Sequence, residues 1–74
     1  MSWDEASETH TEIGAFIVEF LEDKGWPPTV REIGDHMGWS SPSTTHHHLH
    51  AMQAKGLLLR DPSKPRAIRV LDDQ

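Results

Sequence analysis

Two helix-start signals stand only twelve positions apart in this chain of 74 residues, and they constrain its fold more than any other feature. Thr29, with Glu32 three positions later, has the form of a capping box. Ser41 followed by Pro42 places a capping serine before a proline at the first helical position. Because Gly38 supplies a helix stop between them, the first helix has room for about eight residues. The sequence therefore predicts a short helix, a tight turn and a second helix.

The stretch before this unit has the apolar periodicity of an amphipathic helix over residues 9–24. Thr9 and Glu12 have the capping-box form, and Gly25 supplies a C-terminal stop. Glycine inside a helix costs about 1 kcal/mol relative to alanine, so we expect Gly14 to mark a close backbone contact. The predicted buried stripe consists of Ile13, Phe16, Ile17, Phe20 and Leu21.

The helix that begins at Pro42 is predicted to run over residues 42–55 and to end at Gly56. Its inward face is predicted at Thr45, Leu49 and Met52, with His48 at the margin. The side chains left on the outward face or flank are Ser43, Thr44, His46, His47 and His50. The buried side of the preceding short helix is predicted at Val30, Ile33 and Met37.

Beyond Gly56 the pattern changes to two short runs of branched apolar residues, LLLR and AIRVL, separated by a loop that contains prolines. This pattern predicts a β-hairpin with Leu58, Ile68 and Val70 facing inward. The cations expected to project from its strand edges and loop are Arg60, Lys64, Arg66 and Arg69. The predicted fold is therefore mainly α with a small β-hairpin, a winged helix-turn-helix of three helices and a two-stranded antiparallel wing.

The formal net charge of −5 is unevenly distributed along the chain. Residues 1–25 carry seven acids against one lysine, whereas residues 26–71 carry six cations against three acids. A solvated acidic face is the ordinary meaning of the first segment, and the middle of the chain can still face a polyanion. We expect one domain over residues 9–71, with a flexible acidic segment at 1–8 and an acidic tail at 72–74.

Several classes of protein are disfavoured by composition. The chain contains no cysteine, which excludes disulfides and thiolate metal sites. No apolar run approaches the roughly 18 residues of a membrane span, and the start of the chain is acidic where a signal peptide would be basic. We expect a soluble cytoplasmic protein, with neither a membrane nor a small-molecule substrate as partner.

Four of the six histidines lie within positions 46–50. His46 and His50 have the spacing of two metal ligands on a helix, but a zinc site needs a third and a fourth ligand. His10 and His36 could contribute only if the fold brought them near, so we expect no metal and no cofactor. The chain also lacks a Gly-x-Ser-x-Gly elbow and a phosphate-binding glycine loop, and we expect no enzymatic activity.

The remaining interpretation of the outward polar face is geometric. The second helix of a helix-turn-helix enters the major groove of DNA by its N-terminal end. Hydroxyl and imidazole groups there can bond base edges, and the free N–H groups of the helix start can bond a phosphate. The hairpin would then lie on the DNA backbone, with Lys64 and Arg66 as phosphate clamps. The alternative is a protein-docking module, because helix-turn-helix units also serve that purpose.

Several motifs, in order along the chain, closely resemble the DNA-binding domain of LexA, the bacterial SOS-response repressor, in its Gram-positive version. They are PPTVREIG, SSPST, HLxxMxxKG and DPSKPRAI, together with the stripe IxxFIxxFL, and the likeness covers roughly residues 10–71. The resemblance implies a winged helix-turn-helix that recognises double-stranded DNA at a palindromic operator. Its half-sites would be of the GAAC/GTTC kind, and the regulated genes would be repressed.

Carried over position by position, the resemblance implies two sets of DNA contacts. The residues expected to contact bases are Ser41, Ser43, Thr44, His46 and His47. The residues expected to contact the DNA backbone are Thr29, Arg31, His50, Lys64 and Arg66. The chain departs from the family at Thr45, where valine is usual at a core position, and at His47, where a small residue is common.

LexA continues into a second domain that carries self-cleavage and dimerisation, whereas this sequence ends at Gln74. We therefore expect no self-cleavage here. The sequence is either a domain fragment or a stand-alone domain such as a phage-encoded regulator, and we favour the second interpretation, with a homodimer on palindromic DNA as a further expectation. The competing hypothesis is a protein-binding module, a phage antagonist or adaptor, that uses the acidic face of the first helix.

Overall fold

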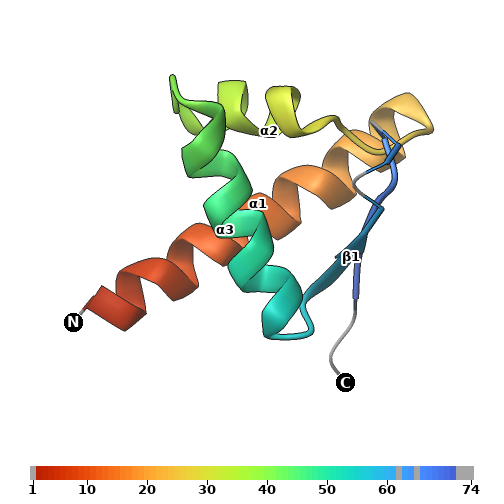
Figure 1. The fold of residues 1–74 in the computed structure, drawn as a ribbon. Helices are drawn as coiled ribbons and strands as arrows, with labels where there is room; N and C mark the ends of the chain where they lie inside the picture. The colour runs from red at the N-terminus through yellow and green to blue at the C-terminus, as the bar shows by residue number, and fades with distance from the viewer. Residues whose placement is uncertain (1, 62, 65, 72–74) are drawn as a thin grey trace.

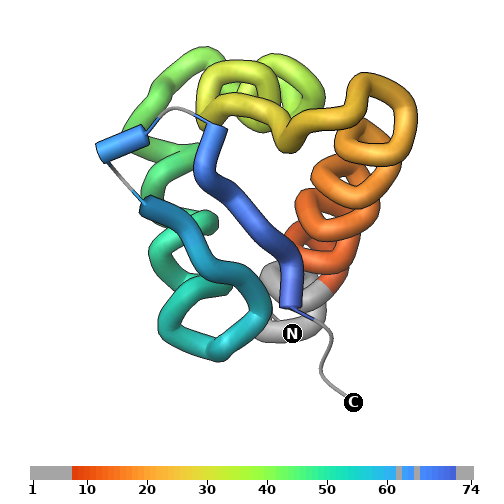
Figure 2. Tube along the Cα trace, turned by 90° about the vertical axis from the view of Figure 1, so that its right-hand side faces the viewer, coloured from red at the N-terminus to blue at the C-terminus, as the bar shows by residue number. Residues whose placement is uncertain are grey.

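The computed structural model describes residues 2–61, 63–64 and 66–71, with side chains from residue 8 onward. Its elements are α1 (Ser2–Lys24), α2 (Val30–Met37), α3 (Pro42–Ala54), β1 (Leu58–Arg60) and β2 (Ile68–Val70). α2 packs against both α1 and α3, and the hairpin closes the other side, with β1 against α3 and β2 against α1 (Figures 1 and 2). The strands are antiparallel, with Leu58 opposite Val70. The predicted winged helix-turn-helix is confirmed.

α1 begins at Ser2, seven residues before the predicted start at Thr9. The prediction that Thr9 caps this helix is wrong, because Thr9 lies inside it. Residues 2–8 contain no proline or glycine, and their acids favour the N-terminal part of a helix, so nothing there stops the backbone. No helix in the described part of the chain is long and apolar enough to cross a membrane. The domain limits at residues 9–71 stay a prediction, and the tail at 72–74 lies outside the described residues.

The core is one cluster of apolar side chains contributed by all three helices and both strands. Its buried members are Ile13, Ile17, Ile33, Leu49, Met52, Leu58 and Ile68. Phe16, Val30, Met37 and Val70 are partly buried and pack against this cluster. Fully burying one such side chain contributes about 1.5–3 kcal/mol, so the cluster is the main source of stability in a domain of this size.

Two further predictions for α1, those for Leu21 and Gly14, are wrong. Leu21 is 46 % exposed, although it belongs to the predicted buried stripe. At 3.6 residues per turn, Leu21 lies about 80° around the helix from Ile13, whereas Ile17 lies only about 40° away. Leu21 therefore stands at the edge of the stripe. Gly14 marks no close contact, because a Cβ at this position would meet no atom within 4 Å.

The predicted caps set the ends of α2 and the start of α3. The hydroxyl of Thr29 accepts a hydrogen bond from the Glu32 amide at 3.1 Å, and the Glu32 carboxylate accepts one from the Thr29 amide at 2.8 Å. Gly38 ends α2 in the left-handed region, with φ of 79°. The Ser41 hydroxyl accepts a hydrogen bond from the Ser43 amide at 3.2 Å. The predicted short helix, turn and second helix start are confirmed.

α2 and α3 approach each other closely at Gly34. A Cβ on Gly34 would lie 2.6 Å from the side-chain oxygen of Thr45, which is only 2 % exposed. The carbonyl of Gly34 also accepts a hydrogen bond from the amide of Trp39, in the turn, at 2.9 Å. The backbone of α2 at Gly34 therefore contacts α3 through one side and holds the turn through the other.

Gly34→Ala is expected to destabilise the fold by about 1–3 kcal/mol, although alanine is the better helix former, because its methyl group collides with Thr45. In a Thr45→Ala background that methyl group finds space, and most of the cost should disappear. Thr45→Val keeps a branched side chain of the same shape and should give no relief. Urea unfolding curves of the single and double variants test this, and an equal cost in both backgrounds would contradict the contact.

Candidate nucleic-acid interface

The N-terminal half of α3 presents a polar outer face. Its exposed side chains, with the cap, are Ser41, Ser43, His46, His47 and His50, and Thr44 is half-buried. The inward residues Thr45, Leu49 and Met52 are buried. The predicted division of α3 into an inward and an outward face is confirmed, whereas contacts of the outer face with bases stay a prediction.

A hollow of about 540 Å³ lies between α2 and the first turns of α3. Arg31 of α2 forms part of its lining, together with the turn around Trp39 and Ser41 and with His46 of α3. This hollow places a residue predicted to contact the DNA backbone beside two that are predicted to contact bases.

A second hollow, of about 210 Å³, lies where the hairpin meets the start of α2. It brings together four predicted site residues from three separate parts of the sequence: Thr29, Arg31, His46 and Lys64. Arg31 and His46 line both hollows, so the two hollows form one continuous surface. The name α3–wing surface is used below for this region, which comprises Thr29, Arg31, Ser41, His46, Arg60 and Lys64.

Arg60 is the member of this surface that the sequence did not assign to the site. Its Nε atom is buried and has no hydrogen-bond partner among the described residues. An unsatisfied buried polar atom costs about 1–3 kcal/mol. Arg60 also lines the second hollow, so its positive charge lies beside those of Arg31 and Lys64. The sequence marks Arg60 only as a cation at the end of a strand. Its position opposite Thr29 and His46 depends on how the hairpin packs, which no local pattern specifies.

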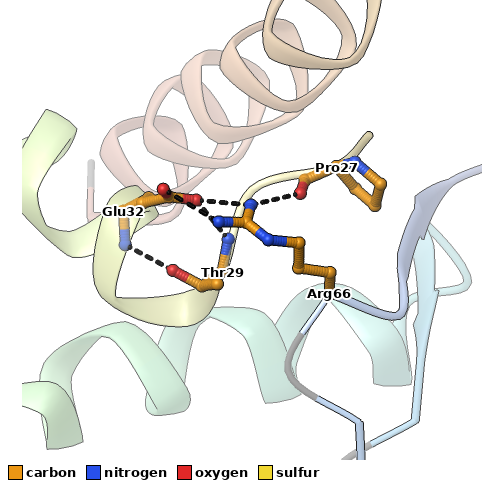
Figure 3. Close-up of polar contacts among 4 residues, drawn as sticks. All are labelled: Pro27, Thr29, Glu32 and Arg66. Carbon is orange, nitrogen blue, oxygen red and sulfur yellow. Dashed lines mark hydrogen bonds and ion pairs between the residues drawn. The ribbon is translucent and has the colours of Figure 1, made fainter. Parts of the chain in front are cut away.

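Arg66 is engaged by the protein rather than projecting from the wing (Figure 3). Its Nη1 donates hydrogen bonds to Glu32 Oε1 and to the carbonyl of Pro27, both at 2.9 Å, and its Nη2 donates to Glu32 Oε2 at 3.2 Å. This pairing with Arg66, followed by the hydrogen bonds from Thr29, lowers the pKa of the Glu32 carboxyl. The expectation that Arg66 projects freely from the wing is wrong, because its guanidinium ties the wing to the start of α2. A contact of Arg66 with a DNA phosphate stays a prediction.

The wing loop is shaped by Asp61. The carboxylate of Asp61 accepts hydrogen bonds from the amide and the hydroxyl of Ser63, at 3.0 and 2.6 Å, which lowers its pKa. The backbone carbonyl of Asp61 accepts a hydrogen bond from the Lys64 amide at 3.0 Å. This turn holds Lys64 at the edge of the second hollow, where its ammonium group is accessible.

The family is decided by comparison with known sequences. The family model described as the LexA DNA binding domain matches residues 5–67. The chain belongs to this family. It is 52 % identical over 68 residues to the LexA repressor of Bacillus pumilus, and these residues make up 92 % of this chain and 33 % of the relative. It is 46 % identical over 70 residues to the LexA repressor of Staphylococcus aureus, and these residues make up 95 % of this chain and 34 % of the relative. The chain thus spans about a third of the length of the curated relatives it matches.

In this LexA-type domain, His10 and His48 form a contact behind the polar face of α3. His10 is only 6 % exposed, and its ring centroid lies 5.7 Å from that of His48. His48 also stacks on Trp39, with centroids 4.6 Å apart. Burial lowers the pKa of both imidazoles, and the charge of Lys55 lowers that of His10 further. These two rings are therefore packing groups that favour the neutral form.

The other histidine considered as a ligand, His36, belongs to the contact between α1 and α2. Its ring stacks on Phe16 with centroids 4.1 Å apart, and its Nε2 lies 3.4 Å from a Glu12 carboxylate oxygen. The side chains that the structure describes include no group of three or more histidines, cysteines or acids arranged to hold a metal ion.

The stability of the domain is expected to fall when the pH is lowered from about 7.5 to about 5.5. The pKa values of His10 and His48 in the folded chain are lowered from the ordinary histidine value of 6.5, so below that pH the folded chain binds fewer protons than the unfolded chain. The stabilisation is complete above that value and is lost as the pH falls through it. Glu32 and Asp61 contribute only at lower pH, because their pKa values are lowered from 4.5 and 3.8.

Urea midpoints measured across this pH range check the expectation. The double variant His10→Leu/His48→Phe keeps an aromatic ring against Trp39 and removes both titrating groups, so its midpoint should depend less on pH. An unchanged dependence in this variant would show that other groups are responsible.

Proposed function

We propose that this chain is a sequence-specific, double-stranded DNA-binding repressor of transcription that recognises palindromic operators with GAAC/GTTC half-sites. The observation that carries the proposal is the α3–wing surface, on which Ser41 and His46 at the start of α3 lie together with three cations from α2 and the hairpin. A helix start beside cations is the arrangement by which a winged helix-turn-helix contacts bases and phosphates at once. The similar proteins of Bacillus pumilus and Staphylococcus aureus are LexA repressors.

The proposed roles follow from the length and charge of the side chains. Short hydroxyls and imidazoles on the first turns of α3 would bond base edges in the major groove. This base-contacting set is Ser41, Ser43, Thr44, His46 and His47. The phosphate-contacting set is Thr29, Arg31, His50 and Lys64, to which we add Arg60, because it lines the second hollow, and from which we remove Arg66. Arg66 would act on DNA only indirectly, by holding the wing in place through Glu32.

The charge distribution supports the same orientation on DNA. Arg31, Arg60 and Lys64 line the α3–wing surface against two acids, Asp35 and Asp61. From residue 8 onward α1 carries five acids against Lys24 alone. A phosphate backbone would repel α1 and attract the wing, which orients the domain before any base is contacted.

An operator with two-fold symmetry offers one half-site to each of two chains. The 74-residue chain tested alone contacts one half-site without a tethered partner, so it lacks the gain of roughly 10² to 10⁴ that linkage provides. We therefore propose micromolar binding to a half-site and improved binding where two chains meet on a full palindrome.

The proposal predicts that fluorescence anisotropy with a labelled palindromic duplex gives an affinity at least about tenfold higher than with a scrambled duplex. His46→Ala should weaken binding to the palindrome by about 1–3 kcal/mol, because it removes a base contact. Gln53→Ala, at an exposed position of the same helix outside the α3–wing surface, is the matched control and should bind normally. Equal affinity for palindromic and scrambled duplexes would refute the proposed specificity.

Lys64 and Arg66 should differ in their effects on salt dependence. Lys64→Ala is expected to reduce the slope of log affinity against log salt by about 1, with the thermal midpoint unchanged. Arg66→Ala is expected to lower the thermal midpoint, because Glu32 and the Pro27 carbonyl lose their shared donor. Arg69→Ala removes a cation from an exposed position on β2 and is the control. It should leave the slope of log affinity against log salt unchanged. The assignment of Lys64 fails if Lys64→Ala and Arg69→Ala have the same slope.

A further inference from the structure

A third hollow, a groove larger than the other two, lies away from the α3–wing surface. It has a volume of about 630 Å³ and lies between α1, the end of α3 and the end of β2. Figure 2 shows the end of β2, in blue, close to the red part of α1. The groove is lined mainly by the apolar residues Ala15, Val18, Met52, Leu57, Val70 and Leu71. Val18 is 41 % exposed, so apolar surface remains open to solvent here.

Gly14 in the wall of this groove has no role in the fold itself. Its φ is not in the left-handed region, and a Cβ would meet no atom within 4 Å. Neither the backbone nor the packing therefore requires glycine at this position, although glycine weakens a helix relative to alanine. The consequence of the missing side chain is that the groove stays open along α1.

The charges around the groove indicate what can occupy it. Glu19 lines the groove, and Glu8 and Glu12 are exposed on the same helix. A second copy of this chain would bring the same acidic helix to the contact, which is repulsive. A partner with cations beside its apolar side chains would meet both the open apolar floor and the acidic wall. Lys55, at the other side of the groove, would favour the negative C-terminal end of a docked helix.

From the open apolar groove and its acidic wall we infer that the domain docks an amphipathic helix of a protein partner, with lysine or arginine on the polar face of that helix. The mode is the insertion of an apolar helix face into a hydrophobic groove. None of the residues that line this groove lines the two hollows of the α3–wing surface. The inference does not rest on the proposed DNA-binding function, and the two surfaces can be occupied together.

The test uses a synthetic helical peptide of about 14 residues, or about four turns, with leucine on one face and lysine on the other. Amide chemical shifts of the ¹⁵N-labelled domain should change on addition of this peptide at the residues that line the groove. Gly14→Met fills the groove and should weaken binding at least about tenfold. Gly14→Ala should be more thermostable than the original chain, which shows that a side chain at this position does not harm the fold.

A matched pair of variants separates docking in the groove from general attraction to an acidic protein. Glu19→Lys and Glu22→Lys change the net charge equally at exposed positions of α1, but only Glu19 lines the groove. Glu19→Lys should weaken peptide binding at least about tenfold and Glu22→Lys less than about twofold. This comparison remains decisive if Gly14→Met fails to fold.

Three outcomes would overturn the inference. The first is an equal loss in Glu19→Lys and Glu22→Lys, and the second is equal binding of a peptide with glutamate in place of lysine. The third is self-association in analytical ultracentrifugation that Gly14→Met abolishes, which would make a second copy the occupant. Anisotropy with the palindromic duplex, measured on the same variants, reports the DNA-binding function separately.

Discussion

The close approach of α2 to α3 at Gly34 determines how the domain presents its second helix. With only a hydrogen on its Cα, Gly34 lets the Thr45 side chain lie where a methyl group would otherwise be. Ile33, next to Gly34, and Leu49, one helical turn after Thr45, are both completely buried. Because the Gly34 carbonyl also holds the amide of Trp39, the same residue fixes the turn that aims the start of α3 outward. The polar face of α3 is therefore positioned by backbone packing rather than by its own side chains.

The wing is positioned by a different interaction, in which the carboxylate of Glu32 both caps α2 and pairs with Arg66. Oε1 of Glu32 accepts hydrogen bonds from the Thr29 amide and from Arg66, so the helix cap and the wing share an acceptor. A bidentate contact between arginine and a carboxylate fixes direction as well as distance. The tie places the loop that carries Lys64 beside the start of α2 and so creates the second hollow. Without the ion pair between Arg66 and Glu32, the wing loop would not be held next to α2, and Thr29 and Lys64 would not lie on one surface.

The parts of the fold that the sequence predicts are those with local causes. Capping at Thr29 and Ser41 depends on residues three positions apart or fewer, so α2 and the start of α3 could be predicted. The start of α1 could not, because the Thr9 capping pattern is also compatible with the interior of a longer helix. Gly14 and Gly34 cannot be told apart in sequence, since each lies inside a helical pattern. Only the neighbouring element shows that Gly34 is crowded and Gly14 is not.

The candidate site was predictable to a similar degree. The outward position of His46 follows from helical periodicity, whereas the functions of Arg60 and Arg66 follow from contacts across the fold. A cation in a polar loop is equally compatible with a solvated, a phosphate-bound and a protein-bound guanidinium. The acceptor of Arg66, Glu32, lies 34 positions away, and no local pattern connects the two. Sequence periodicity therefore predicts which surface is polar, while packing determines which of its cations remain available to a ligand.

The two proposed surfaces of the domain would be coupled by charge even without a change in shape. The chain carries a net charge of −5, and most of its acids lie in α1, away from the cations of the wing. A cationic helix docked beside Glu19 would neutralise part of the charge that repels a phosphate backbone. Such a partner would raise the affinity for DNA, and by reciprocity DNA would raise the affinity for the partner. The coupling would weaken with added salt, because charges farther apart than about 8 Å are largely screened at physiological ionic strength. A domain of this size could in this way bind a second protein preferentially where it is already on DNA.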